Sequence, residues 1–300
     1  MRKLKRVVLG VVLGIWALGA AAGDTKVAGF DSPEIVILGD SQIPFGSGPA
    51  FLEFFTDLKS HCAPNQEQET YLERLGAKRV AVIGVRSTSI HSWTARSGKA
   101  KEAVCKVDPK WKVNAGTYGY VNTTGNKYVQ IGRGKAYQFC EPGQSPFEAM
   151  FRDGYYAPKL FLMSFLGNSA RRWAESKEQA KADVEEMMRH IPEDVPCIFM
   201  TTAPAYSKKI VDLRLKAQEN IQAAFEETGN RCSFVRGATE ETVEAYQGNM
   251  EFFRLNKKGR VKDPYHPNQA AAENFFALEM GNICSAIFEQ ISTLPEPQTH

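Results

Sequence analysis

Short apolar runs alternate with longer amphipathic segments along most of this chain. The apolar runs have the length of buried strands, and they cover 35–38, 79–84, 160–166, 196–201 and 232–235. Apolar residues recur at helical spacing in the segments between and after them, chiefly 51–58, 170–191, 207–228 and about 267–291. Strands that alternate with helices predict a doubly wound α/β sheet covered by helices.

A segment from about residue 99 to residue 154 interrupts this alternation. Its Gly/Asn turns and its spacing predict short strands over 113–122 and 127–139, so we expect a β-rich insertion between core strands. As a cap over a substrate cleft, it would offer aromatic rings for stacking on sugars: Trp111, Tyr118 and Tyr120. As a surface hairpin, it would pack the same rings on the domain. The sequence leaves both interpretations open.

The N-terminus has the pattern of a secretory signal peptide. Four cations within residues 2–6 precede an apolar run over 7–18, and small residues follow up to Ala22 and Gly23. We predict a signal peptide over 1–22, a single mature domain over 23–300, and a periplasmic or secreted protein. An uncleaved membrane anchor is the alternative, but the run is short for a spanning helix. We therefore expect no stable membrane insertion after cleavage.

Composition narrows the class of protein further. The chain has 300 residues, 43% of them hydrophobic and 24% charged, which suits one large globular domain. The formal net charge of +3 is too small to indicate a nucleic-acid partner. No Cys/His spacing suggests a zinc site, and nothing points to an organic cofactor, so we expect none.

Six cysteines follow the predicted signal peptide. An even number in an exported chain permits up to three disulfides. Cys105 and Cys140 flank a polar Gly/Tyr-rich stretch and are the first pair that we expect to be bonded. Cys197 lies in an apolar strand and Cys284 on an apolar helix, so both also suit buried free thiols.

Residues with catalytic chemistry follow the predicted strands. Gly39-Asp40-Ser41 comes directly after the first strand, Gly84 ends the second, and Asn168 follows the third. Asp263 and His266 stand three residues apart, just before the last helix. In open α/β sheets, active sites lie at the carboxyl ends of the strands. These residues supply the nucleophile, base and orienting acid that acyl transfer requires.

In these blocks the chain resembles the SGNH hydrolase superfamily, also called GDSL esterases and lipases. That superfamily is named for a Ser, a Gly, an Asn and a His in four separated blocks, here Ser41, Gly84, Asn168 and His266. The resemblance implies a flavodoxin-like three-layer α/β/α sandwich with a central parallel sheet. It also implies a nucleophilic Ser41, a base His266 and an orienting Asp263. The implied oxyanion donors are the backbone N–H groups of Ser41 and Gly84 and the side-chain amide of Asn168.

The blocks depart from the family pattern at three places. Gln42 stands where Leu is usual, Ser169 stands where the third block usually has Asp, and the second block offers only Gly84.

The sequence therefore predicts an exported serine esterase that hydrolyses acyl esters through an acyl-serine, with O-acetyl groups on carbohydrate as the expected substrate. A polysaccharide O-acetyltransferase shares the same chemistry up to the acyl-enzyme and differs only in the acceptor. A catalytically idle glycan-binding module on the same fold is the alternative outside enzymology. Hydrolysis compared with transfer to an added oligosaccharide separates the first two, and binding that survives Ser41→Ala without any ester turnover identifies the third.

Overall fold

The computed structural model describes residues 26–27, 30–76, 79–105, 118–123, 126–130, 139–154 and 156–296. The predicted signal peptide over 1–22, its cleavage site and Trp111 lie outside these residues. Tyr118 and Tyr120 are described only as backbone positions of a strand, so the role proposed for their rings also falls outside the description.

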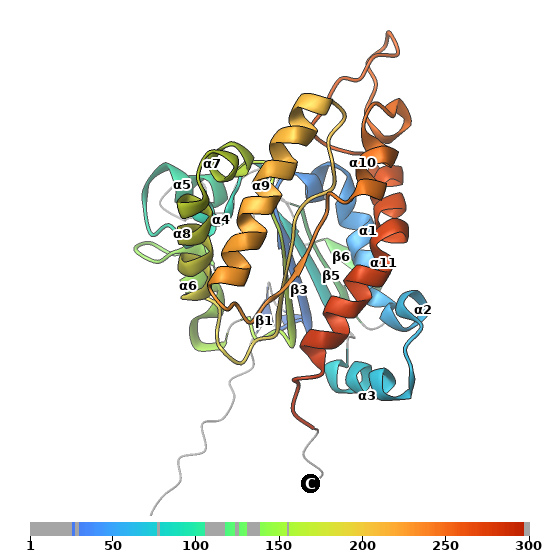
Figure 1. Ribbon diagram of the computed structural model, residues 1–300. Coiled ribbons are helices and arrows are strands. Elements are labelled where there is room, and N and C mark those ends of the chain that lie inside the picture. Colours follow the sequence, from blue (N-terminus) through green and yellow to red (C-terminus); the bar gives the residue numbers. More distant parts are fainter. Residues whose placement is uncertain are drawn as a thin grey trace, which may run out of the picture.

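A parallel sheet forms the centre of the molecule and confirms the α/β prediction (Figure 1). Its five parallel strands, in spatial order, are β4 (Val80–Gly84), β3 (Ile35–Gly39), β7 (Leu160–Ser164), β8 (Cys197–Met200) and β9 (Ser233–Val235). Counted along the chain, these strands stand in the order 2-1-3-4-5, which is the flavodoxin-like arrangement. The order reverses between β3 and β7, and this is the position at which such folds bind ligands.

Two further strands extend the sheet beyond β4. β5 (Tyr118–Thr123) pairs antiparallel with β4, and β6 (Asn126–Gln130) pairs antiparallel with β5. Both lie within the segment that we predicted to be a β-rich insertion. A separate two-stranded ribbon joins β1 (Lys26–Val27) to β2 (Phe30–Asp31).

Helices cover the sheet on both faces and complete a three-layer sandwich. One layer consists of α4 (Ile90–Thr94), α5 (Gly98–Val104), α6 (Pro146–Phe151), α7 (Ala170–Glu175), α8 (Lys177–Met188) and α9 (Lys208–Glu227). The other consists of α1 (Gly48–Thr56), α2 (Leu58–Cys62), α3 (Gln66–Leu75), α10 (Glu240–Tyr246) and α11 (Gln269–Ile291). The short turns η1 (Ile43–Ser47), η2 (Arg152–Gly154) and η3 (Met250–Phe252) lie between these elements.

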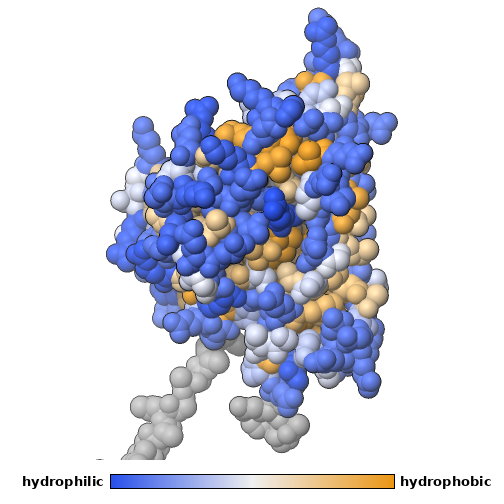
Figure 2. All heavy atoms as spheres, viewed as in Figure 1, coloured by the Kyte–Doolittle hydropathy of each residue, from blue (hydrophilic) through white to orange (hydrophobic). Residues whose placement is uncertain are grey.

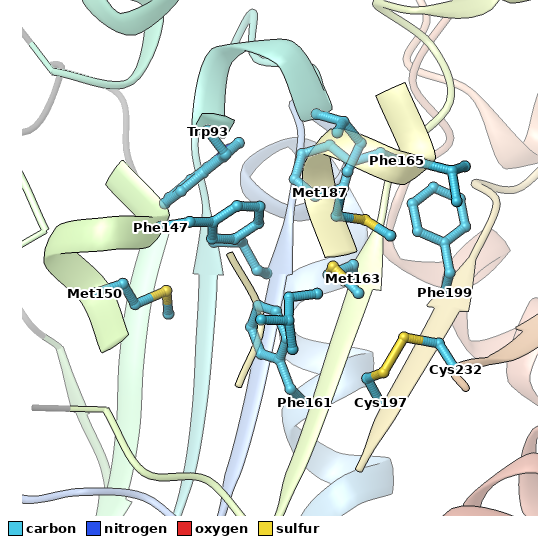
Figure 3. Packing of buried hydrophobic residues seen from close by; sticks show 14 of the residues in the cluster. Trp93, Phe147, Met150, Phe161, Met163, Phe165, Met187, Cys197, Phe199 and Cys232 are labelled. Carbon is cyan, nitrogen blue, oxygen red and sulfur yellow. A yellow bond between two sulfur atoms is a disulfide. The ribbon is translucent and has the colours of Figure 1, made fainter. Parts of the chain in front are cut away.

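Each central strand contributes alternate residues to two separate cores. In β3, Val36 and Leu38 pack into one core while Ile35 and Ile37 pack into the other, and all four are fully buried. Because both faces of the sheet are covered, the strand reads as a continuous apolar run rather than an alternating one. Figure 3 shows the first core, where Phe161 of β7 lies among the side chains of the covering helices.

All six cysteines are paired in three disulfides. The Cys105–Cys140 pair confirms the prediction, whereas the free thiols considered for Cys197 and Cys284 were wrong. Cys197 of β8 is bonded to Cys232, which directly precedes the neighbouring β9, and their Cα atoms are 4.6 Å apart. Cys284 of α11 is bonded to Cys62 at the end of α2, 222 residues away in sequence. Three disulfides are typical of proteins that fold in an oxidising compartment outside the cytosol.

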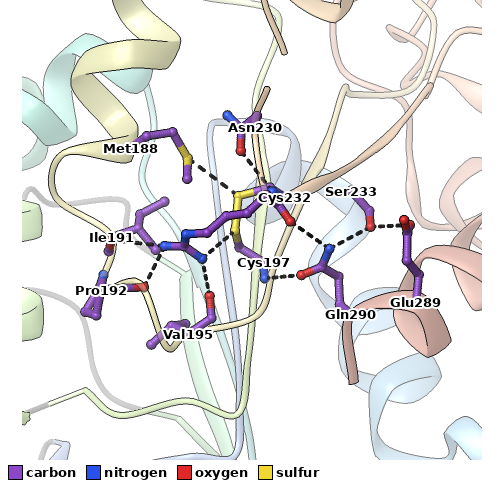
Figure 4. The surroundings of a disulfide bond; sticks show 11 residues. Met188, Ile191, Pro192, Val195, Cys197, Asn230, Cys232, Ser233, Glu289 and Gln290 are labelled. Carbon is purple, nitrogen blue, oxygen red and sulfur yellow. Dashed lines mark hydrogen bonds between the residues drawn. A yellow bond between two sulfur atoms is a disulfide. The ribbon is translucent and has the colours of Figure 1, made fainter. Parts of the chain in front are cut away.

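A side chain of α11 also binds the strands β8 and β9, which the Cys197–Cys232 disulfide connects. Gln290 accepts a hydrogen bond from the backbone N–H of Cys197 and donates to the hydroxyl of Ser233 (Figure 4). The last helix is therefore held to β8 and β9 by polar contacts as well as by its apolar face. In the described part of the chain, no helix has both the length and the apolar character needed to cross a bilayer.

Candidate functional site

The predicted catalytic residues gather at the carboxyl edge of the sheet, at the point where the strand order reverses. Ser41 follows β3 after Gly39 and Asp40, and Asn168 lies in the turn that follows the neighbouring β7. His266 arrives from the loop that precedes α11, where Asn268 caps the helix by accepting from the N–H of Ala271. Three segments far apart in sequence therefore meet at this edge of the sheet.

Ser41, His266 and Asp263 form a continuous hydrogen-bonded relay. The Oγ of Ser41 lies 2.8 Å from Nε2 of His266, and Nδ1 of the same ring lies 2.9 Å from Oδ2 and 3.0 Å from Oδ1 of Asp263. An ionised carboxylate can only accept, so Nδ1 carries the proton and Nε2 is free to accept from the serine hydroxyl. The imidazole and carboxylate side chains are only 19% and 17% exposed, which limits competition from water.

The pKa of Asp263 favours its ionised form. Burial raises this pKa, but the hydrogen bond and charge of His266, the N–H of Tyr265 and the hydrogen bond from Arg254 together hold it below the ordinary value. Asp263 therefore stays a carboxylate at neutral pH and keeps the His266 ring in the orientation that Ser41 needs.

The turn that presents Ser41 is built around the buried Asp40. Its carboxylate accepts from the backbone N–H of Gln42 at 2.9 Å and closes the turn. The Gln42 side chain, in the place where the family usually has Leu, donates to the carbonyl of Ala203 at 3.3 Å. Burial raises the pKa of Asp40, and the N–H of Gln42 and the nearby guanidinium of Arg214 oppose that rise.

Arg214 of α9 anchors the loop that carries the histidine. Its buried guanidinium donates to the carbonyls of Ala203 at 3.2 Å and Tyr265 at 3.1 Å. It also lies against Gly167, where an added Cβ would be 3.2 Å from Nη2 of Arg214 and 3.6 Å from Oδ2 of Asp40. The Arg214 guanidinium therefore lies close to the turn that carries Ser41 and contacts both the Asn168 turn and the His266 loop.

Gly46 allows the loop that carries His266 to approach Ser41. A Cβ at Gly46 would lie 2.5 Å from the carbonyl oxygen of Pro267, which is far too close for any side chain. The glycine in η1 thus makes room for the backbone next to His266. Our sequence analysis missed this residue, because the run from Gly46 to Pro49 has the composition of an ordinary turn.

Asn168 lies at the site with its side chain exposed. Its amide nitrogen donates to the carbonyl of Thr88 at 2.8 Å, which orients the amide and leaves its second hydrogen for another acceptor. The contact brings the turn after β4 against the turn after β7. Within the turn after β4, Ser87 adopts a left-handed conformation with φ 63°, which is uncommon for a residue other than glycine.

Gly84 has a packing role at the end of β4. A Cβ there would lie 2.4 Å from Cβ of Ile43 and 2.6 Å from Cδ of Pro44. The start of η1 therefore lies directly on this strand end, and only glycine leaves space for it. Its contribution to an oxyanion hole stays a prediction, and within this segment it is Thr88 that accepts a hydrogen bond from the Asn168 side chain.

An aromatic ring with cations beside it lies next to His266. The Phe45 ring is 4.4 Å from the His266 ring, centroid to centroid. The guanidinium of Arg86 lies 4.4 Å from the centroid of Phe45, and that of Arg254 lies 4.8 Å from it. Arg254 also binds Asp263 at 2.8 Å, so the relay ends in a cation.

No group of three or more His, Cys, Asp or Glu side chains within the described residues is arranged to hold a metal ion. The arrangement is that of side-chain acid–base and nucleophilic chemistry. A serine hydroxyl, an imidazole and a carboxylate in series can activate an oxygen nucleophile without further groups.

Comparisons with known proteins name no family for this chain. It matches no protein-family model and no curated protein. Among solved structures, a DUF4886 family protein from Bacteroides uniformis aligns over 89% of this chain and 88% of its own, with a TM-score of 0.40 and 12% identity. A second structure aligns over 85% of this chain and 98% of its own, with a TM-score of 0.39 and 12% identity. At these TM-scores and identities, neither alignment assigns a family or a function to this chain.

Proposed function

We propose that this protein is an exported serine esterase of the SGNH type that hydrolyses acyl esters, above all O-acetyl esters on carbohydrate. The observation that carries the proposal is the relay from Ser41 through His266 to Asp263, with hydrogen-bond distances of 2.8 and 2.9 Å. Its place at the switch point of a flavodoxin-like sheet adds support, because ligands of such folds bind there.

In the proposed mechanism, the Oγ of Ser41 attacks the carbonyl carbon of the ester while Nε2 of His266 takes the hydroxyl proton. The tetrahedral intermediate collapses, the bond to the alcohol oxygen breaks, and His266 returns its proton to that oxygen. Water then attacks the acyl-serine with His266 again as base, and the acid product leaves with the Ser41 hydroxyl restored. Asp263 stays ionised throughout and stabilises the imidazolium.

Hydrogen-bond donors at the carboxyl edge of the sheet would stabilise the negative charge on the oxygen of the tetrahedral intermediate. We assign this role to the backbone N–H groups of Ser41 and Gly84 and to the Asn168 amide, whose second hydrogen is not used by Thr88. Such donors act most strongly when they are fixed before the reaction begins. The bond from Asn168 to Thr88 provides that fixation for the side chain.

Carbohydrate is the proposed substrate because export and three disulfides suit a periplasmic or secreted enzyme that meets extracellular polymers. Phe45 beside His266 is half-buried, and the two guanidinium groups over its ring, those of Arg86 and Arg254, belong to exposed residues that a ligand can reach. Transfer of the acyl group to a sugar acceptor, rather than to water, needs the same acyl-serine. It is therefore one possible outcome of the test below.

The test is hydrolysis of p-nitrophenyl acetate by the mature chain, beside Ser41→Ala and His266→Ala, with Ser60→Ala as a control at an exposed serine. We expect wild type and control to turn over alike, and both site variants to lose on the order of 10⁶-fold in kcat. A wild type that releases p-nitrophenol only when an oligosaccharide is added, and that acetylates this oligosaccharide, would favour a transferase. An inert wild type that only binds glycans would overturn the enzyme assignment.

A further inference from the structure

A projecting hairpin precedes the catalytic Asp263, and we call residues 254–262 the basic arm. Five of its nine residues are Lys or Arg and none is acidic. Its two limbs pair through the bridge between Leu255 and Val261, and the N–H of Lys262 donates to the carbonyl of Arg254 at 2.8 Å. A turn at Gly259, with φ 71°, closes it. The arm is therefore an ordered element, visible as the orange loop at the top of Figure 1.

Four of the five cations of the arm face solvent without an acidic partner in the described part of the protein. Lys257, Lys258, Arg260 and Lys262 are all exposed, and none forms an ion pair with a described residue. Figure 2 shows the projecting tip as strongly hydrophilic. Like charges crowded on a short hairpin repel one another, so they add nothing to folding stability and instead create a positive field at the edge of the site.

This field continues into the candidate active site. Arg254, at the base of the arm, binds Asp263 and lies over the Phe45 ring. Arg86 contacts the same ring, is exposed, and forms no ion pair with a described residue. Cationic side chains therefore extend from Arg86 and Arg254, which flank the Phe45 ring beside His266, to the tip of the arm.

We infer that the substrate is a polyanionic polysaccharide, whose carboxylate or sulfate groups bind Arg86 and the basic arm while an ester on the same chain reaches Ser41. This inference rests on the proposed esterase function and names its substrate class. A polymer fits better than a membrane surface because the cations follow a narrow hairpin that leads away from the triad, with Leu255 as the only large exposed apolar side chain on it. Guanidinium groups bind carboxylate and sulfate oxygens through paired N–H donors.

Binding can be tested separately from turnover. The Ser41→Ala protein is titrated calorimetrically with polygalacturonate, dextran sulfate and neutral xylan, at low and at high salt. We expect it to bind at least one acidic polymer and not xylan, and we expect the affinity to fall steeply with salt because exposed charges are screened. Preference between the two acidic polymers identifies carboxylate or sulfate as the recognised group.

The decisive variant replaces the four outer cations of the arm with glutamine: Lys257, Lys258, Arg260 and Lys262. The matched control replaces four exposed cations on other elements, with the same loss of charge: Lys59, Lys99, Lys177 and Arg189. We expect the arm variant to lose about 10-fold or more in polymer affinity and the control to lose little. The control variant should hydrolyse p-nitrophenyl acetate at the wild-type rate, since it changes no residue of the relay or of the arm.

Any of four results would overturn the inference. Equal polymer affinities for the arm variant and its control would show that the arm is merely solvated. Salt-insensitive binding, or binding to xylan as tight as to the acidic polymers, would remove the role of charge. Binding to phosphatidylglycerol vesicles in preference to every polymer would assign the arm to a membrane surface. Failure of p-nitrophenyl acetate hydrolysis would count against the esterase proposal alone, because polymer binding is measured without turnover.

Discussion

The two sides of Ser41 differ in the contacts that the fold makes there. On one side, side chains of Ser41, His266 and Asp263 are already joined by hydrogen bonds, and the buried Arg214 holds the loop that carries two of them. On the other side, the Asn168 amide is bound to Thr88, and Gly84 is packed beneath Ile43. The first side depends on three side chains, whereas the second combines one side chain with the close approach of the backbone at Gly84. Substitutions on the two sides should therefore reduce activity by different amounts.

The largest effect is expected on the relay side. Asp263→Asn keeps the size of the side chain but removes its charge, so Nδ1 of His266 is no longer held as the protonated nitrogen. We expect kcat for p-nitrophenyl acetate to fall about 10⁴-fold with a small change in KM. Asp212→Asn, at an exposed residue paired with Lys208, serves as the charge-matched control. A variant that keeps one tenth of wild-type activity would show that Asp263 does not orient the base.

A smaller effect on activity is expected on the side of Asn168, where we propose the oxyanion hole. Asn168→Ala removes one proposed donor, and we expect kcat to fall about 10²–10³-fold while KM changes little. Asn168→Asp, which has the same shape but cannot donate, should be at least as impaired. Full activity in either variant would remove Asn168 from the oxyanion hole and leave it as the residue that fixes the turn after β4.

The junction between the two sides is tested at Gly46. Gly46→Ala would place a Cβ 2.5 Å from the Pro267 carbonyl and push the His266 loop away from Ser41. A displacement of about 1 Å can cost on the order of 10²-fold in rate, so we expect a loss approaching that size. Gly281→Ala is the matched control, because a Cβ there meets nothing within 4 Å, and it should leave kcat unchanged. Equal activities of the two variants would contradict the close approach.

The smallest effect concerns the dependence of folding stability on pH. The pKa of Asp263 is lower in the folded protein than its ordinary value, so its ionised form stabilises the fold above that ordinary value. This contribution is lost as the pH falls through the lowered pKa. Urea unfolding at pH 7 and pH 3 should therefore show a greater loss of stability on acidification for wild type than for Asp263→Asn. Equal losses in the two proteins would contradict the assigned shift.

The sheet and the relay were predictable because their signals are local and chemical. Runs such as Ile35–Leu38 can be buried on both faces only in a covered sheet, which is what the structure has. The helix predicted over 170–191 is broken at Ser176, whose hydroxyl accepts from the N–H of Gln179 and starts a new helix. That cap is short-range, but continuous helical spacing across the break concealed it.

Other features depend on how distant segments meet, which no spacing rule describes. Cys284 pairs with Cys62 only because α2 and α11 pack together, so its apolar neighbours were a poor guide to its redox state. The need for glycine at Gly46 and Gly84 arises from atoms of Pro267 and Ile43 that approach from elsewhere in the chain. The basic arm is visible in the sequence as five cations in nine residues, but their spacing does not show that they form a hairpin that projects beside the His266 loop.

The central claim is that Ser41 is a nucleophile activated by His266, and covalent labelling tests it most directly. The mature protein is treated with diisopropyl fluorophosphate, its intact mass is measured, and the adduct is mapped by peptide sequencing. The account predicts a single adduct on Ser41, with no labelling in Ser41→Ala and much slower labelling in His266→Ala. An unlabelled wild-type protein, or an adduct on any other residue, would contradict it.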